Sequence, residues 1–427
     1  MTEGVSARRR FEAGLLALAV AVLLFVVGGG VLAWIVTALA VASIAAALRE
    51  AERGVPAASR SLSLHGAVSA DLLLASVWEG TAQFRRVPAL ARAAADVEAA
   101  LARWREQGWL AAPARAFAAP PPLEKVQIEM RAVAGGGDAE HLRFASEFEP
   151  ADPEIADCFL ARDANRTAHV LLWRHRSTTP RPTLIALHGF GMGRLARDLP
   201  WLQLRGLDWM RVHRELGIDI AYVILPFHGP RSDGTPSGRG FFDVHPLFAP
   251  TALAQAVWEL RRIAGWLRAQ GTPAIGVHGL SLGGCAAALF AAFDPALACG
   301  VPMCPAVDLA EIFWRQLPPA RRREWQDAGI GPALLADAWS VAAPLRHRPQ
   351  GSVAGRLVIG AIGDQIATPP GVEALWRHWD EPAIHWLPGA HLAWLGKTTL
   401  GPRLAAHLRA TLLAEPASAS LLSRFRF

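Results

Sequence analysis

Cysteines are scarce in this chain of 427 residues, which has only four: Cys158, Cys285, Cys299 and Cys304. None of them forms a C-x-x-C pair, so the sequence offers no redox pair and no disulfide framework. Three of the four lie in apolar stretches, which predicts buried thiols that behave as small hydrophobic groups. This usage favours a reducing compartment.

Charge of either sign is also low, at 19% of the residues, and the formal net charge is only +6. Basic residues cluster at positions 8–10 and 321–323, but no zinc spacing, basic helix or aromatic RNA-binding strand accompanies them. We therefore expect no nucleic-acid partner. The basic clusters suit an anionic membrane surface instead.

Charged residues are absent altogether from residues 13–48, and arginines flank both ends of this run. The run is too long for one crossing of about 20 residues and long enough for two short ones, with three glycines at 28–30 to form the turn. We predict a transmembrane helical hairpin at 13–48, with both ends and the rest of the chain on the cytoplasmic face of a bacterial-type inner membrane. One tilted span with an exported domain, or a signal peptide cleaved after Ala33, stays open as an alternative.

The remaining sequence divides into segments by composition. Residues 71–78 and 90–109 have apolar side chains at helical spacing, and three prolines at 120–122 end any helix. The predicted organisation is a membrane anchor at 1–53, a helical connector at 54–122, a catalytic domain at 123–414 and a C-terminal tail at 415–427. No internal repeat is present.

Short apolar runs separated by amphipathic stretches such as 251–270 follow the prolines. The later runs are unbroken, as in strands of a parallel sheet covered on both faces. We therefore predict an α/β fold in which two hairpin-like strands precede a mostly parallel sheet flanked by helices. The predicted strands are 125–131, 142–148, 169–174, 183–187, 218–225, 274–278, 299–303, 356–362 and 383–387.

One predicted strand, 274–278, runs directly into the sequence G-L-S-L-G at 279–283, followed by a helical stretch at 284–293. This is the G-x-S-x-G pattern, in which small residues let a tight strand-to-helix turn present a serine hydroxyl. The strand before it and the helix after it make the pattern more specific than its five letters. Ser281 is therefore the candidate nucleophile.

A serine hydroxyl needs a base, and the base needs a carboxylate to orient it. Asp364 and His391 each follow a predicted strand directly, at the carboxyl edge where open α/β sheets build their sites. Asp308, after the strand at 299–303, is the alternative acid. His278, just before the elbow, is expected to serve core packing rather than base catalysis.

Acyl transfer also requires hydrogen-bond donors for a developing oxyanion. The strand at 183–187 ends in H-G-F-G at 188–191, where a glycine-bracketed turn can aim the amide of Phe190 at the same point as the amide of Leu282. We expect His188 and Gly189 to line the substrate site. His228, after the strand at 218–225, is a candidate pocket residue or a loop-stabilising one.

Taken in this order and spacing, L-H-G-F at 187–190, G-L-S-L-G at 279–283, G-D at 363–364 and P-G-A-H at 388–391 resemble the α/β-hydrolase superfamily of serine esterases, lipases and peptidases. The resemblance covers residues 125–413. It implies a Ser-Asp-His hydrolase that works through an acyl-enzyme without cofactor or metal. Ser281 departs from the carboxylate nucleophile of the superfamily's dehalogenases, and Phe190 departs from the HGGG turn of hormone-sensitive-lipase-like esterases.

Between two predicted strands lies an aromatic and basic stretch, 305–350, where this superfamily often inserts a lid. A lid beside a membrane anchor would suit a lipid-like acyl substrate; the other interpretation is a helical cap with tryptophans in its core. The function predicted is hydrolysis of a carboxylic ester. The alternatives are a prolyl-oligopeptidase-like peptidase, an acyltransferase, or an inactive membrane scaffold, and the sequence leaves the oligomeric state open.

Overall fold

A computed structural model of the chain describes residues 67–69, 71, 90–242, 245–394 and 397–414. The predicted hairpin at 13–48, most of the predicted helix at 71–78 and the tail at 415–427 lie outside these residues. Within the described parts of the chain, no helix has both the length and the apolar character that a membrane crossing requires.

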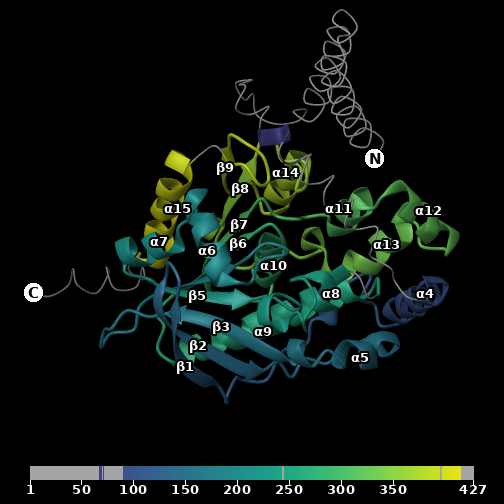
Figure 1. Cartoon of the computed structure of the whole chain (residues 1–427), viewed down its shortest axis with the longest axis horizontal. Helices are drawn as coiled ribbons and strands as arrows, with labels where there is room; N and C mark the ends of the chain where they lie inside the picture. The colour runs from purple at the N-terminus through teal and green to yellow at the C-terminus, as the bar shows by residue number, and fades with distance from the viewer. Residues whose placement is uncertain (1–66, 70, 72–89, 243–244, 395–396, 415–427) are drawn as a thin grey trace, which may run out of the picture.

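A nine-stranded sheet forms the centre of the described residues, in the order β1-β2-β3-β5-β4-β6-β7-β8-β9 (Figure 1). The pairs β1/β2, β2/β3 and β3/β5 are antiparallel, whereas all neighbouring pairs from β5 to β9 are parallel. The strands are β1 Gln127–Val133, β2 Gly137–Ala145, β3 Thr167–Trp173, β4 Thr183–Leu187, β5 Asp219–Ile224, β6 Ile275–Leu280, β7 Leu297–Met303, β8 Leu357–Ala361 and β9 Ala383–Leu387.

Each of these strands corresponds to a run predicted from the sequence, and the bounds of β4 and β9 are those predicted. The largest shift is in β2, which was expected at 142–148. Gly135 and Gly137 adopt φ angles of 77° and 75°, a conformation that glycine reaches without strain, so the chain turns immediately after β1 and β2 begins early. The antiparallel part of the sheet contains three strands, β1 to β3, where two were expected.

The parallel strands are covered by helices on both faces. Along β4, Ile185 and Leu187 join the cluster formed with α9 (Phe248–Ala269) and α10 (Leu282–Phe290). The alternate residues, Leu184 and Ala186, join the cluster formed with the helices of the opposite face. Those helices are α6 Leu195–Leu204, α7 Trp209–Leu216 and α15 Lys397–Leu412. This period of two explains why the runs read as unbroken apolar stretches in the sequence.

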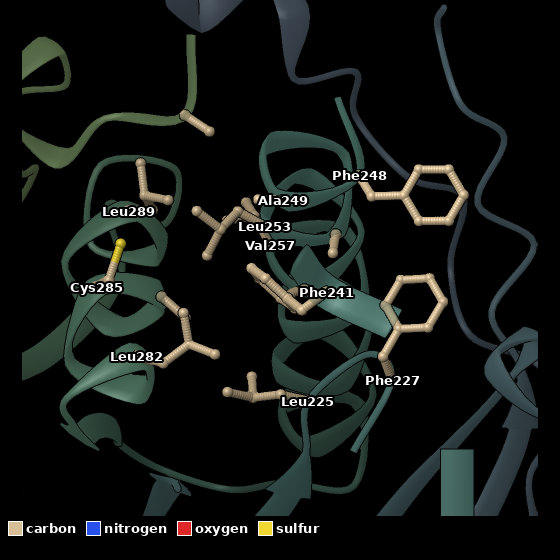
Figure 2. Packing of buried hydrophobic residues seen from close by; sticks show 14 of the residues in the cluster. Leu225, Phe227, Phe241, Phe248, Ala249, Leu253, Val257, Leu282, Cys285 and Leu289 are labelled. Atoms are coloured by element: carbon tan, nitrogen blue, oxygen red, sulfur yellow. The ribbon is translucent and has the colours of Figure 1, made fainter. Parts of the chain in front are cut away.

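Helices α9 and α10 pack against each other through buried apolar side chains (Figure 2). Leu282, Cys285 and Leu289 are spaced three and four residues apart, so they lie on one face of α10, and they belong to the same buried cluster as Leu253 and Val257 of α9. This contact fixes the helix that begins immediately after Ser281. It also confirms a buried, unpaired Cys285.

The predicted connector contributes to the same core. Its helix α4 (Leu90–Glu106) buries Val97, Leu101 and Trp104 in the cluster that contains α9. The Trp104 indole donates to the carboxylate of Asp152 at 2.8 Å, just before α5 (Pro153–Leu160). Residues 90–106 are thus packed on the domain that contains the sheet, by apolar and polar contacts alike.

The stretch predicted as a lid or a cap forms three helices, α11 Leu309–Gln316, α12 Pro319–Asp327 and α13 Pro332–Trp339. Phe313, Trp325 and Trp339 are buried, and the ring of Phe313 lies 5.3 Å from that of Trp325 and 5.4 Å from that of Trp339. The tryptophans therefore form the interior of a helical cap. The shorter helices α8 (Arg239–Phe242) and α14 (Pro369–His378) complete the elements named in Figure 1.

Candidate active site

Ser281 lies in the sharp turn between β6 and α10. Its φ and ψ angles are 55° and −113°, a combination that non-glycine residues rarely adopt and that costs about 1–3 kcal/mol. The surroundings hold it there: its amide donates to the carbonyl of Met303 at 2.9 Å, and its carbonyl accepts from the amides of Cys285 and Ala306. Backbone strain of this kind clusters at functional sites, so Ser281 is a candidate for one.

The glycines on either side of Ser281 are required by close approach of the backbone. A Cβ atom on Gly279 would lie 2.0 Å from the carbonyl oxygen of Gly283. A Cβ on Gly283 would lie 2.5 Å from the carbonyl oxygen of His188. No side chain fits at either position, which explains in atomic terms the small residues of the G-x-S-x-G pattern.

Ser281, His391 and Asp364 lie together at the carboxyl edge of the sheet. His391 Nε2 is 2.9 Å from Ser281 Oγ, and His391 Nδ1 is 2.7 Å from Asp364 Oδ2. Because a carboxylate only accepts, Nδ1 carries the proton and Nε2 presents its lone pair to the serine hydroxyl. This tautomer is the one a general base needs.

Asp364 is fully buried, and its carboxylate is held by its own loop after β8. Its Oδ1 accepts hydrogen bonds from the amides of Ile366 and Ala367, both at 2.8 Å, which leaves Oδ2 for His391. The loop is joined to the one after β9 by the amide of Gly363, which donates to the carbonyl of Gly389 at 2.8 Å. The acid and the histidine are therefore positioned relative to each other by backbone as well as side chains.

The environment of His391 changes its proton affinity. Burial alone would lower the pKa of this imidazole, but the charges of Asp364 and Asp71 and the hydrogen bond to Asp364 outweigh burial. The pKa of His391 therefore lies above its ordinary value of 6.5. The imidazolium form, which a base catalyst passes through, is stabilised at this site.

Next to Ser281 lies the turn that follows β4. His188 accepts from the amide of Leu225 at Nε2 (3.1 Å), so its Nδ1 carries a proton and donates to the carbonyl of Gly189 at 2.8 Å. Burial lowers the pKa of His188 to about 4, which keeps the ring neutral. The C=O and N–H of a trans peptide point in opposite directions, so this bond also fixes the direction of the Phe190 amide.

Of the other residues predicted for the site, His188 and His228 are buried behind the cavity rather than lining it, whereas Gly189, Phe190 and Leu282 line it together with Ser281. His228 Nδ1 bonds the carbonyl of Pro226 at 2.7 Å, a contact within its own loop. Leu282 is the first residue of α10, where backbone amides have no partner inside the helix.

The alternative acid lies elsewhere, and His278 is part of the core, as expected. Asp308 is exposed and accepts from the amide of Glu311 at 2.9 Å, so it caps the start of α11. His278 is fully buried in β6 with its ring 5.8 Å from that of Trp209, and burial lowers its pKa to about 3. Neither side chain contacts the three residues described above.

A cavity of about 610 Å³ opens onto Ser281 and His391. This volume lies within the usual range for small-molecule sites, about 300–1,000 Å³. Its walls are mostly apolar, and four parts of the fold contribute most of them: the turn after β4, α6, α11 and the loop after β9. The apolar lining residues from these parts are Phe190, Met192, Trp201, Leu309, Ile312, Phe313, Leu392 and Trp394.

Asp71 is the residue near the site that the sequence did not single out. It is fully buried, and its carboxylate accepts from the amides of His391 at 2.5 Å and Leu392 at 2.9 Å. No local pattern distinguishes Asp71 from other acidic residues in a helical stretch. Only the fold brings it beside the loop of His391, 320 positions further along the chain.

One group in the described residues has side chains of the kind that bind metals: His175, His213 and Asp219. It lies by the start of β5, at the opposite edge of the sheet from Ser281. His175 Nδ1 pairs with Asp219 at 3.1 Å and His213 Nδ1 bonds the carbonyl of Ile218 at 2.7 Å. These contacts account for the group, and we assign no metal to it.

Together, the mostly parallel sheet, the strained serine between β6 and α10, and the ordered contacts from Ser281 through His391 to Asp364 define an α/β-hydrolase fold. No protein-family model matches the sequence. The chain belongs to the same family as Uncharacterized protein MT2702 of Mycobacterium tuberculosis (strain CDC 1551 / Oshkosh), with 35% identity over 308 residues that cover 70% of this chain and 71% of the relative.

Solved structures similar to this chain include an acetyl xylan esterase from Paenibacillus sp. R4, with 13% identity, 86% of this chain and 99% of that chain covered, and a TM-score of 0.46. Est1E from Butyrivibrio proteoclasticus is similar at 15% identity, with 58% of this chain and 96% of that chain covered and a TM-score of 0.41.

Proposed function

We propose that the protein is a serine hydrolase that cleaves carboxylic esters with an apolar acyl group. The observation that carries this proposal is the chain of contacts Ser281–His391–Asp364, with 2.9 Å and 2.7 Å between the polar atoms, at the mouth of an apolar cavity. A base in the correct tautomer beside a strained serine is the arrangement that acyl transfer needs.

The proposed reaction has two halves. Ser281 Oγ attacks the ester carbonyl carbon while His391 Nε2 takes the hydroxyl proton, and Asp364 stabilises the imidazolium. The amides of Phe190 and Leu282 donate to the oxyanion. The C–O bond to the alcohol then breaks, and His391 returns the proton to the leaving oxygen. In the second half, His391 takes a proton from water as the water oxygen attacks the acyl carbon. The bond from that carbon to Ser281 Oγ then breaks, His391 returns the proton to Oγ, and the carboxylic acid leaves.

The substrate class follows from the cavity. Its walls are mostly aliphatic and aromatic, so an acyl chain placed there would be removed from water at a gain of about 0.8 kcal/mol per methylene group. Each added methylene that fits should therefore raise kcat/KM several-fold. Chains longer than the cavity should gain nothing further.

The test is hydrolysis of p-nitrophenyl esters from acetate to dodecanoate by the full chain. We expect kcat/KM to rise with chain length and then level off, and Ser281→Ala to lose activity on all of them. Ile312→Trp, which fills the cavity wall on α11, should lower activity on long esters more than on acetate. Glu311→Trp, on the exposed side of the same helix, is the matched control. Equal activity of wild type and Ser281→Ala would contradict the proposal.

We also propose that residues 13–48 attach this activity to a membrane, with the catalytic domain on the cytoplasmic face. The support is the uncharged apolar run between arginines at 8–10 and 49. The full chain should remain in membranes after alkaline carbonate extraction, and protease should reach the catalytic domain in inverted vesicles only. Digestion in intact spheroplasts would instead place the domain outside.

A further inference from the structure

Asp71 lies between the two loops that carry the acid and the histidine of the triad. Its Oδ1 accepts from the amide of Leu392 at 2.9 Å and its Oδ2 from the amide of His391 at 2.5 Å. The amide of Gln365, next to Asp364, also points at Oδ2 from 3.5 Å, at the limit of a hydrogen bond. One carboxylate thus engages backbone donors from the loop after β8 and the loop after β9.

Because Asp71 is buried, its carboxylate indicates a role other than packing. Asp71 is fully buried, and burying a charged group costs several kcal/mol unless hydrogen bonds compensate for it. A core residue with only a packing role would be apolar at this position. The backbone amide of His391 is also the group that sets the direction in which the imidazole leaves the chain.

We propose that Asp71 is a positioning residue of the active site: its carboxylate holds the backbone of His391 and Leu392 so that Nε2 stays within hydrogen-bond distance of Ser281. This inference rests on the proposed serine hydrolase function. It makes Asp71, a residue only 23 positions after the end of the apolar run at 13–48, part of the support of the active site.

The charge of Asp71 also acts on His391 directly. Three titratable side chains of the described residues face it: Asp364, His391 and Cys304, the last directly after β7. Burial and the neighbouring Asp364 raise the pKa of Asp71 to about 7, whereas His391 and the two amides act in the opposite direction. Removal of the Asp71 charge takes away part of what raises the pKa of His391.

The experiment measures the rate constant of fluorophosphonate labelling of the full chain from pH 5 to pH 9. Asp71→Asn keeps the shape of the side chain but loses the charge and one acceptor. We expect its labelling at pH 8 to be slower by at least about tenfold, as for loss of orientation of a base. We also expect the acid limb of its pH profile to move to lower pH.

Two variants complete the test. Asp71→Ser, smaller and uncharged, should show the same shift of the acid limb and stands in if Asp71→Asn does not fold. Asp294→Asn, a buried carboxylate that pairs with Arg268 beyond the far end of α10, should label like wild type. Melting temperatures identify which variants are folded.

A folded Asp71→Asn whose profile superimposes on that of wild type would overturn the proposal. So would a profile lowered by the same factor at every pH, because a merely structural role does not move the limb. Failure of the proposed function looks different: the wild type itself would not be labelled, whatever residue 71 is.

Discussion

At the scale of single residues, the backbone conformation of Ser281 is set by the glycines around it rather than by its own side chain. Its backbone stays in a strained conformation because Gly279 and Gly283 let three segments of backbone come within contact distance. The sequence pattern identifies this serine because only glycine fits at positions 279 and 283. The reactivity proposed for Ser281 therefore depends on the conformation of the backbone at this residue.

Substitution of Gly279 tests this dependence. The methyl group of Gly279→Ala would overlap the carbonyl of Gly283, so we expect a loss of about 3 kcal/mol or more in the free energy of unfolding. Gly265→Ala in α9 has open space and is the control, with an expected gain of up to about 1 kcal/mol. Urea denaturation measures both, and a neutral Gly279→Ala would contradict the account of the turn.

The pH dependence of activity follows from His391. Only the neutral imidazole accepts the serine proton, and the pKa of His391 lies above 6.5. Activity should therefore be low under acidic conditions and rise with pH, with a midpoint above 6.5. The measurement is kcat/KM on a short ester whose leaving group does not titrate in this range. A midpoint well below 6.5 would mean that Asp364 does not act on the histidine as described.

At the scale of elements, a buried polar network fixes the loop after β5 to α9. The guanidinium of Arg231 makes two hydrogen bonds of 2.7 Å to the carboxylate of Glu259, and both side chains are buried. The same guanidinium donates to the backbone carbonyls of Ile224 and Asn165. This network supports the loop that contains His228.

Truncation of one partner should be costly because the other charge is left buried. We expect Glu259→Ala to destabilise the protein by about 3–5 kcal/mol. Glu215→Ala removes a solvent-exposed pair with Arg211 on α7 and should cost less than about 1 kcal/mol. Thermal unfolding of the two variants side by side gives the comparison. Similar small losses would show that the network is not structurally important.

The elements also show what a single sequence can predict. The runs at 183–187 and 383–387 have the bounds of β4 and β9. β4 is buried along its whole length and is marked by its own residues, whereas the edge strand β9 is only partly buried. The strand ends then located Ser281, Asp364 and His391, which the fold brings together. Arg231 and Asp71 were missed because their partners are distant in sequence and follow no local period.

At the scale of the whole molecule, helix α4 and the sheet with its covering helices share one hydrophobic core. Helix α4 lies in the stretch predicted as a connector, but its Trp104 is buried in the cluster that also contains α9 and α10. Its indole and the guanidinium of Arg103 both bond the carboxylate of Asp152. We therefore expect this segment and the sheet to unfold together.

Truncation of Trp104 tests that expectation. Trp104→Ala should lower the free energy of unfolding by about 3–5 kcal/mol, in one cooperative transition of the whole described domain. Arg105→Ala, on the exposed side of the same helix, should change it by less than about 0.5 kcal/mol. Two separate transitions in wild type, seen by tryptophan fluorescence and far-ultraviolet circular dichroism, would contradict a shared core.

The proposed function depends on Ser281 as an activated nucleophile with His391 as its base. The most direct measurement is the reaction of the full chain with a fluorophosphonate, followed by mass spectrometry of the labelled peptide. We predict one phosphonyl group on Ser281 in wild type, none on Ser281→Ala, and at least about a hundredfold slower labelling of His391→Ala. Wild-type protein that stays unlabelled, or that is labelled at another residue, would contradict the claim.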